Sequence, residues 1–369
     1  MRIIQMLPAL NIGGIERGVV DLSRELVRHG WDSIVLSAGG ELARRIDDDG
    51  GRHIIFDCAA KNPFNAPIRA WRLRRLLQQL EPDIIHIRSR VPAWLLRFVG
   101  APCSTVSTFH GLYKVGRYSS RMAAADKVIC PSTAVFEHVS RHYGTPDERL
   151  AVIHRGVDLE YFDPQKADIE FCRRFQQKHH LENAVIASIV GRLSALKGHD
   201  IFIRAIARAK QKIPGLVGLI VGDSGKISRL SRLKTLAAEL GIGEHLRFVG
   251  AQKQMREFYH LSDFVISASR QPEAFGRTVA EALAMERPVI APAHGGALDI
   301  IRDGENGYLV PPADDAALAD ALMLIWGTSK KWQKLRESVQ CFSLAQMTEK
   351  TIAVYEKIHS QRTPPKPSV

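Results

Sequence analysis

Two carboxylates, Glu273 and Glu281, stand with seven residues between them in the stretch QPEAFGRTVAEALAMERPVIAPAHGG. A carboxylate offers two oxygen acceptors, which suits recognition of neighbouring hydroxyl groups. Glu273 falls in a turn bounded by proline and glycine. Glu281 falls about a turn and a half into a predicted helix that begins near Gly276. An exposed loop glutamate and a helix-surface glutamate would by themselves explain such a pair, so other residues have to decide between the two interpretations.

A second group of residues is cationic and lies in the loop GRLSALKG, which begins at Gly191. The loop follows an apolar strand predicted over 184–190, and a helix is predicted to begin near Gly198. A glycine turn at a helix N-terminus favours an anion; Arg192 could fork onto phosphate oxygens while Lys197 acts as a point charge. Two such cations could stabilise a departing diphosphate without a metal ion. The alternative is that these are ordinary polar residues at the start of a helix and bind no ligand.

Two adjacent glycines, Gly13 and Gly14, separate the predicted strand 2–6 from a helix predicted over 15–28. Glycine lets backbone N–H groups approach a ligand closely, and the helix N-terminus favours an anion. Glu16, like Arg17 beside it, could reach the same ligand. A plain tight turn is the alternative. The spacing is not G-x-G-x-x-G, so a dinucleotide site loses its main support.

Three further side chains follow predicted strands of the first half. Arg88 and Arg90 flank a serine after one strand, and His110 follows the strand 104–108 in front of a glycine. Paired arginines recognise phosphate and carboxylate well, so these two are candidates for holding an anionic acceptor. Surface charge explains them equally well, and a lone histidine is more often structural than catalytic.

Alternating strands and helices must position all of these residues, which predicts an α/β fold of doubly wound domains with ligands beyond the carboxyl ends of the strands. A chain of 369 residues is too long for one ordinary core. We predict an N-terminal domain over 1–165, a second domain over 166–343, a helix over 344–359 that returns to the first domain, and a disordered tail over 360–369. The predicted strands are 2–6, 33–37, 53–57, 83–88, 104–108, 127–131, 150–153, 184–190, 216–221, 246–249, 264–267, 288–291 and 307–310.

Composition narrows the class of protein. No run of 18 apolar residues is present, and the N-terminus lacks the apolar core of a signal peptide. Five scattered cysteines without metal-ligand spacing are expected to be reduced thiols in a cytoplasmic protein. The net charge of +12 suits an anionic partner. No nucleic-acid-binding motif is present, so we expect that this partner is not a nucleic acid.

The helix predicted over 69–80, RAWRLRRLLQQL, combines four arginines with Trp71 and four leucines. Basic amphipathic helices can lie on anionic lipid, so peripheral contact with the inner face of the cytoplasmic membrane is one interpretation. A helix with its apolar side in the core and a solvated arginine side is the other.

The motifs together resemble those of retaining GT-B glycosyltransferases of the large GT4 family. Besides Glu-x7-Glu with Phe-Gly after the first glutamate, Gly-Arg-Leu-x3-Lys-Gly, the Gly-Gly loop, Phe-His-Gly and a Gly-Val-Asp turn occur in the family's order over roughly residues 1 to 359. The resemblance implies two Rossmann-like domains facing a cleft that holds a nucleotide sugar. Two residues depart from the pattern: Arg277 replaces a small or aliphatic residue, and Arg155 stands where asparagine is commoner.

The resemblance also implies residue roles. Glu273 would bind donor-sugar hydroxyls, Glu281 the ribose, and Arg192 with Lys197 the diphosphate. His110 would contact the donor sugar near the reacting centre. Backbone groups would complete the donor site at Gly13, Gly14, Gly250, Gln252, Phe275, Gly276 and Arg277, while Glu16, Arg88, Arg90 and His110 would face the acceptor.

With Glu281 assigned to ribose, a double displacement lacks its second carboxylate. We therefore expect front-face substitution with retention, in which the leaving diphosphate takes the acceptor proton, with no metal ion and no cofactor. GDP-mannose or a UDP-hexose is the expected donor. The segment SRVPAW from Ser89 and the EAFGR motif resemble sugar transferases of lipopolysaccharide core assembly, which implies an anionic lipid-linked envelope glycan as acceptor. A GT-B sugar-nucleotide epimerase, a phosphorylase, or a non-catalytic anionic-glycan or membrane-binding protein are the alternatives.

Overall fold

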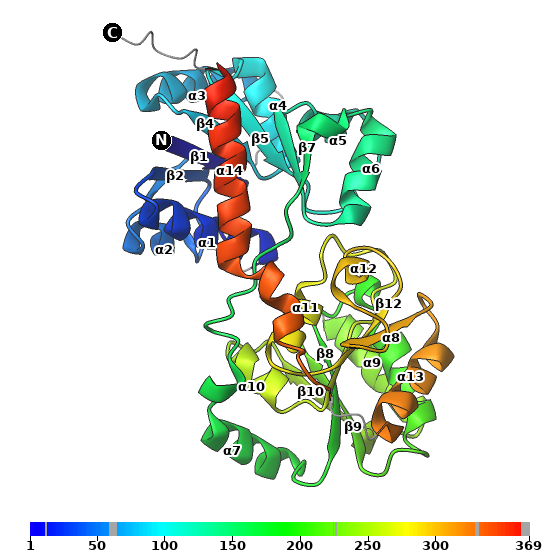
Figure 1. Ribbon diagram of the computed structural model, residues 1–369. Coiled ribbons are helices and arrows are strands. Elements are labelled where there is room, and N and C mark those ends of the chain that lie inside the picture. The colour runs from blue at the N-terminus through cyan, green and yellow to red at the C-terminus, as the bar shows by residue number, and fades with distance from the viewer. Residues whose placement is uncertain (12, 59–64, 224, 226, 329–331, 363–369) are drawn as a thin grey trace. The chain divides into compact units, whose positions relative to one another are not determined.

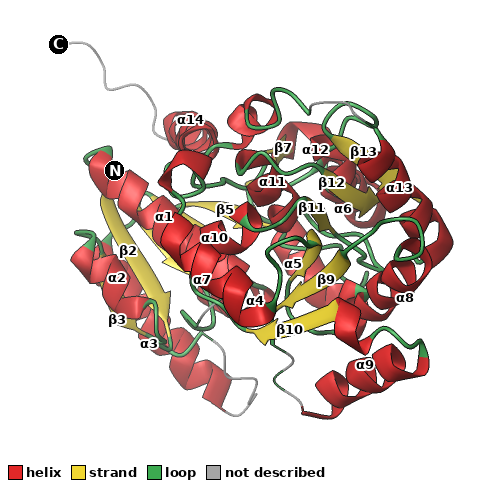
Figure 2. Cartoon of the chain, turned by 90° about the horizontal axis from the view of Figure 1, so that it is seen from below, coloured by secondary structure: helices red, strands yellow, loops and turns green. Residues whose placement is uncertain are grey.

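The computed structural model describes residues 1–11, 13–58, 65–223, 225, 227–328 and 332–362 (Figure 1). Contacts between Cα atoms divide the chain into two compact units. Unit 1 holds residues 1–156 together with the C-terminal segment from Leu344, and unit 2 holds residues 157–343. Each unit is built on a parallel sheet flanked by helices (Figure 2), so the predicted fold class is confirmed.

In unit 1 the strand order reverses between β1 and β4. The sheet runs β3-β2-β1-β4-β5-β6-β7, all parallel in register, with Ile4 of β1 opposite Ile34 on one side and Ile85 on the other. Loops beyond the carboxyl ends of strands at such a reversal are where open α/β sheets bind ligands. The strands are β1 (Arg2–Met6), β2 (Asp32–Ser37), β3 (Arg52–Ile55), β4 (Ile84–Ile87), β5 (Ser104–Thr108), β6 (Lys127–Cys130) and β7 (Leu150–Val152).

The helices of unit 1 form two groups of neighbours. α1 contacts α2 and α14, and α4 contacts α3 and α5. The C-terminal helix belongs to this unit because Ile352, Tyr355 and Ile358 join the core formed by Ile3 and Leu26. The helices are α1 (Gly14–Arg28), α2 (Ala43–Asp48), α3 (Ala66–Leu80), α4 (Arg90–Val99), α5 (Arg117–Ala123), α6 (Thr133–Tyr143) and α14 (Leu344–Arg362).

In unit 2 the strand order reverses between β8 and β11, in the sheet β10-β9-β8-β11-β12-β13. The loops after these two strands are the ones that carry Lys197 and Glu273. The strands are β8 (Val185–Val190), β9 (Leu216–Val221), β10 (Leu246–Gly250), β11 (Phe264–Ile266), β12 (Val289–Pro292) and β13 (Gly307–Val310). The helices are α7 (Ile169–His179), α8 (His199–Ala209), α9 (Ile227–Glu239), α10 (Met255–His260), α11 (Arg277–Ala284), α12 (Ala297–Ile300) and α13 (Asp315–Gly327).

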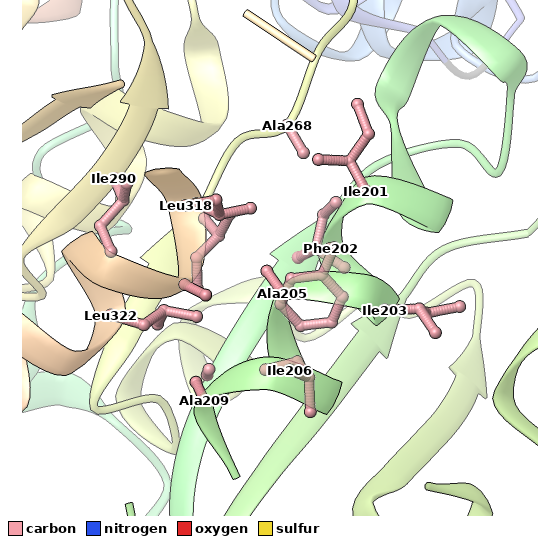
Figure 3. Packing of buried hydrophobic residues seen from close by; sticks show 14 of the residues in the cluster. Ile201, Phe202, Ile203, Ala205, Ile206, Ala209, Ala268, Ile290, Leu318 and Leu322 are labelled. Carbon is pink, nitrogen blue, oxygen red and sulfur yellow. The ribbon is translucent and has the colours of Figure 1, made fainter. Parts of the chain in front are cut away.

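The core of unit 2 holds the start of α8 in place. Ile201 and Phe202 of α8 lie in one buried cluster with Leu318 and Leu322 of α13 and with Ala268, which follows β11 (Figure 3). Burial of large apolar side chains of this kind stabilises by about 1.5–3 kcal/mol each. The loop before α8 and the loop after β11 are therefore anchored to one apolar core.

The division between the units falls before Val157, earlier than the predicted boundary after residue 165. Val157 donates its backbone N–H to the Phe342 carbonyl, and Arg336 donates to the carbonyls of Leu159 and Phe162. These bonds tie the segment after Val157 to unit 2. At the other end, α14 continues to Arg362, three residues beyond its predicted end, and the tail 363–369 lies outside the described residues.

Two further expectations concern membrane-spanning helices and the state of the cysteines. Across the described ranges, no helix has the length and apolarity needed to cross a membrane. All five cysteines are free thiols, and burial raises the pKa of Cys58 and of Cys130 to about 12. These two thiols are therefore protonated and unreactive near neutral pH.

Candidate active site

Close backbone packing joins the loops after β8 and β11. Gly198 has φ +65°, and a Cβ added there would lie 1.9 Å from the Ala268 carbonyl oxygen. Any other residue would therefore push the two loops apart. Arg270 donates its backbone N–H to the Leu196 carbonyl over 2.7 Å, which closes the same junction. The junction holds the two loops in one arrangement.

An ion pair lies at this junction. The Lys197 ammonium is 2.7 Å from Glu273 Oε1, and the Ser269 hydroxyl donates to the same oxygen. Burial opposes ionisation of Glu273, but Lys197, Ser269 and the field of His294 outweigh it, and the pKa of Glu273 is lowered. Both side chains keep about a quarter of their surface exposed, at 28% and 25%. Glu273 is therefore ionised near neutral pH, and the pair is open to a ligand.

The pair has unused capacity for a polar ligand. Lys197 has further N–H groups, and Oε2 of Glu273 can accept bonds from hydroxyl groups. Arg192 is exposed in the same loop. The loop leads into the N-terminus of α8, where the helix dipole adds positive potential. An anion with neighbouring hydroxyl groups is the ligand that this chemistry fits.

Glu281 is buried on α11 and already accepts two hydrogen bonds. The Tyr259 hydroxyl donates to Oε2 over 2.8 Å, and Arg277 Nε donates to Oε1 over 2.7 Å. Each carboxylate oxygen has two lone-pair sites, so Glu281 can still accept from a diol. Sequence reasoning left the role of Arg277 open; in the structure it is the (i, i+4) ion partner of Glu281.

The Phe-Gly turn before α11 can present only its main chain. The Phe275 ring is buried against Phe342, at 5.6 Å between ring centroids. Gly276 has φ +99° and precedes the first residue of α11. The first N–H groups of a helix have no intrahelical acceptor, and this turn leads into the first turn of α11.

The loop after β10 also offers mainly backbone. Gly250 has φ +71°, and its carbonyl accepts from the Gly222 N–H over 2.8 Å. The Gln252 side-chain amide donates to the Val249 carbonyl over 2.5 Å, which leaves its oxygen available.

His294 is a residue that sequence reasoning missed. It precedes Gly295 and Gly296 after β12, and the Gly296 N–H donates to the Glu273 carbonyl over 2.9 Å. Both His294 ring nitrogens are inaccessible to solvent and have no hydrogen-bond partner. Buried polar atoms without partners are rare and costly, so they point to a ligand that completes them. The Gly-Gly turn at a strand end was the available signal.

In unit 1, two guanidinium groups converge over Gly18 of α1. A Cβ added at Gly18 would lie 3.5 Å from Nη1 of Arg155 and 3.7 Å from Nη2 of Arg88. Arg88 is 6% exposed, and burial lowers its pKa to about 10. Its nearest partner is the His86 ring at 3.3 Å, and none of the described carboxylates pairs with it. A buried cation in this state favours an anionic ligand.

Arg155 sets the state of His110. Its Nη1 donates to the Gly14 carbonyl over 2.9 Å, and its Nη2 lies 2.6 Å from His110 Nδ1. Arginine can only donate, so Nδ1 accepts and the proton of the neutral ring is on Nε2. Burial, Arg155 and Arg88 hold the pKa of His110 well below its usual range. His110 is thus a neutral donor whose buried Nε2 has no partner.

Gly13, Gly14, Glu16 and Arg90 of unit 1 were also predicted to contact a ligand. The Glu16 carboxylate covers Gly13, where an added Cβ would lie 2.2 Å from Oε2, while Gly14 faces open space. Glu16 therefore complements the N-terminus of α1 itself. Arg90 does not join Arg88; its guanidinium stacks over the Tyr113 ring at 4.5 Å.

Comparison with known proteins gives consistent matches. Residues 172–340 match the family described as Glycosyl transferases group 1, and residues 12–161 match Glycosyltransferase Family 4. The structure of a glycosyltransferase from Rickettsia africae ESF-5 is 31% identical and covers 97% of this chain and 98% of its own, with a TM-score of 0.89. Anabaena Alr3699/HepE in complex with UDP-glucose shares the fold at 20% identity, with a TM-score of 0.82 over 97% and 100% of the two chains.

A D-inositol 3-phosphate glycosyltransferase of Streptomyces bingchenggensis (strain BCW-1) is 34% identical over 206 residues, which are 53% of this chain and 44% of that protein. The match thus spans less than half of this relative's length. Two adjoining family matches and a solved relative similar over its whole length agree with the two parallel-sheet units. The chain belongs to the group 1 glycosyltransferases of the GT4 type, which have the GT-B fold.

Proposed function

We propose that this protein transfers a hexose, with retention of configuration and without a metal ion, from a nucleotide sugar to an acceptor that carries an anionic group. The observation that carries the proposal is the Lys197–Glu273 pair at the strand reversal of unit 2, with its free acceptor oxygen and neighbouring cation Arg192. These groups match the two halves of a nucleotide sugar, an anionic diphosphate and a polyhydroxyl ring.

The donor is held by residues of unit 2. Lys197 and Arg192 bind the diphosphate, and Glu273 accepts bonds from the sugar hydroxyls. Glu281 binds the ribose, and backbone groups at Gly250 and α11 complete the site. A UDP-hexose and GDP-mannose are the two donors considered, and the Anabaena neighbour solved with UDP-glucose makes that sugar nucleotide the first to test.

The acceptor is proposed to bind through a phosphate or similar anion. Arg88 and Arg155 supply the positive charge, and His110 donates from Nε2. The relative from Streptomyces is named for D-inositol 3-phosphate, a phosphorylated polyol. A phosphorylated lipopolysaccharide-core glycan, supported by the motifs at Ser89 and Glu273, is the second candidate, and its lipid anchor would bring the enzyme into peripheral contact with a membrane.

In the proposed reaction the anomeric C–O bond to the diphosphate breaks while the acceptor oxygen bonds to the same face of the sugar. The diphosphate oxygen accepts the acceptor's proton, and Lys197 and Arg192 stabilise the charge that develops on it. Glu281 is assigned to the ribose and not to a second catalytic role, and its bonds with Tyr259 and Arg277 on α11 support that assignment. Retention therefore follows without a glycosyl-enzyme intermediate.

A thermal-shift panel with UDP, GDP and their sugars, with and without magnesium, tests the donor site. A nucleotide at a hundred times its dissociation constant should add about 2.7 kcal/mol of stability. Glu273→Ala should abolish transfer while nucleotide-induced stabilisation persists, and Lys197→Ala should weaken it. Turnover of Glu273→Ala at the normal rate, or no response of the wild type to any nucleotide, would contradict the proposal. NMR of the product's anomeric proton tests retention, and hydrolysis or isomerisation without acceptor would favour the epimerase alternative.

A further inference from the structure

The outer side of α3, α4 and α5 in unit 1 is rich in arginine and aromatic side chains. Leu73 and Leu77 of α3 are buried, and a helix turns 100° per residue, so Trp71 and Arg75 lie on its opposite, outward side. Trp71 is 58% exposed, and the Arg75 guanidinium stacks over its ring at 5.0 Å. The predicted amphipathic helix thus buries its leucines and leaves its tryptophan in solvent.

The same pattern continues on α4. Its buried residues include Leu95 and Leu96, so Arg97 and Phe98 face outward, and Phe98 is 66% exposed. Trp94 lies between Phe98 and α5, where its Nε1 donates to the Tyr118 carbonyl over 3.0 Å. The exposed helices are direct neighbours, because α4 contacts both α3 and α5. We call the outward side chains of these three helices the basic face of unit 1.

Positive charge predominates on the basic face. The helix α3 contains four arginines and no acidic residue. The exposed arginines of the face are Arg72, Arg74 and Arg75 of α3, Arg97 of α4 and Arg117 of α5. A surface on which cations predominate attracts an extended anionic partner, and the potentials of its arginines add within a Debye length of about 8–10 Å.

A hollow of about 530 Å³ adjoins the basic face at the edge strand β3. Its lining includes Ile55, Trp71, Arg72 and Arg75, with Asp57 at one side. Ile55 is 79% exposed and Ile68 of α3 is 54% exposed. Partly exposed apolar and aromatic side chains beside arginines are the composition that binds the headgroup region of a bilayer, with rings at the interface and guanidinium groups on phosphates.

We propose that the basic face of unit 1 docks on an anionic lipid bilayer, with Trp71 and Phe98 entering the headgroup region and the exposed arginines Arg72, Arg74, Arg75 and Arg97 contacting lipid phosphates. The proposal concerns a surface separate from the donor residues of unit 2 and the Arg88–Arg155 cluster. It extends the proposed function by naming the partner at which the acceptor would be met. The excess of positive charge on the face is what selects a bilayer rich in anionic lipid.

Vesicle flotation of the full chain tests the proposal. Wild type should float with vesicles containing phosphatidylglycerol and not with pure phosphatidylcholine, and added salt should release it. The double variant with Arg72→Glu and Arg75→Glu should bind on the order of 25-fold more weakly, because each basic residue near an anionic surface contributes about 1 kcal/mol. Trp71→Ala should weaken binding without changing net charge.

A matched control changes the same charge in unit 2. Arg232→Glu with Lys234→Glu, both exposed on α9, alters net charge equally and should leave flotation nearly unchanged. Equal loss in both double variants would mean that only total charge matters and would overturn the proposal, as would absence of wild-type flotation. Nucleotide-induced stabilisation, measured on the same samples, separates this outcome from failure of the donor site. Thermal melting of each variant verifies that it is folded.

Discussion

The guanidinium of Arg155 donates to Nδ1 of His110 over 2.6 Å and thereby determines which ring nitrogen carries the proton. Arg155 stands at the turn where asparagine is commoner in enzymes of this kind, and it also binds the Gly14 carbonyl. One side chain therefore links the glycine loop after β1 with the histidine after β5. His110 is left neutral, with its proton on a buried Nε2 that has no hydrogen-bond partner.

Replacement of Arg155 tests this arrangement. Arg155→Ala should lower kcat about 10- to 100-fold, the effect of losing a charge-assisted hydrogen bond of about 1.5–3 kcal/mol. Loss of the neighbouring cation should also raise the pKa of His110, since Arg155 helps to depress it. The variant would then lose activity at a higher pH than the wild type as the solution is acidified, in a pH–rate profile over about pH 5 to 8. Arg141→Ala, on the exposed side of α6, is the control, and an unshifted acid limb in Arg155→Ala would refute the role.

Arg88 and Arg90 are separated by one residue but should behave differently. Arg88→Gln removes a buried guanidinium that has no carboxylate partner, so the KM for an anionic acceptor should rise about 10- to 100-fold while nucleotide binding is unchanged. Arg90→Gln removes a cation that stacks on Tyr113 and should change this KM less than about threefold. Initial rates at varied acceptor concentration give both values. Equal effects of the two variants would exclude Arg88 as the specific anion contact.

His294 is expected to contribute to the choice of donor sugar. Its unpartnered ring nitrogens lie inaccessible beside the Glu273 loop. His294→Ala should change the ratio of kcat/KM between epimeric nucleotide sugars about 10-fold, the effect of one hydrogen bond. His294→Asn keeps a donor and an acceptor and should restore part of the preference. Isothermal titration with the nucleoside diphosphate alone should give wild-type affinity, and an unchanged sugar preference in His294→Ala would refute the prediction.

Gly241 and Gly198 have similar backbone angles, so replacing each with alanine distinguishes the cost of backbone strain from the cost of steric overlap. Gly241 has φ +63° with nothing near an added Cβ, whereas at Gly198, with φ +65°, the Cβ would lie 1.9 Å from the Ala268 carbonyl oxygen. Gly241→Ala should lower the free energy of unfolding by about 1–2 kcal/mol. Gly198→Ala should lower it by several kcal/mol more and weaken nucleotide binding, as measured by urea denaturation and thermal shift. Equal destabilisation would show that the loop junction is not rigid.

Sequence alone determined the local elements and the class of chemistry. Strands 2–6, 216–221 and 307–310 were predicted at their observed bounds, because buried parallel strands are short apolar runs and each of these is followed within two residues by proline or glycine. The grouping of cations in the loop after β8 and of carboxylates around the Phe-Gly turn was also visible, since both depend on residues close together in the chain. The resemblance to GT4 glycosyltransferases came from these local motifs and their order.

Tertiary structure decided which residues meet. In the sheet of unit 2 the strand order reverses between β8 and β11, and that reversal brings Lys197 to Glu273 across 76 positions of sequence. The neighbours of Arg88, the proton position on His110 and the unpartnered ring of His294 depend on similar long-range packing. No local pattern encodes such contacts, because they arise from strand pairing and from loop junctions such as Gly198 against Ala268. The burial of the leucines of α3 and the exposure of Trp71 were likewise decided by how that helix packs in unit 1.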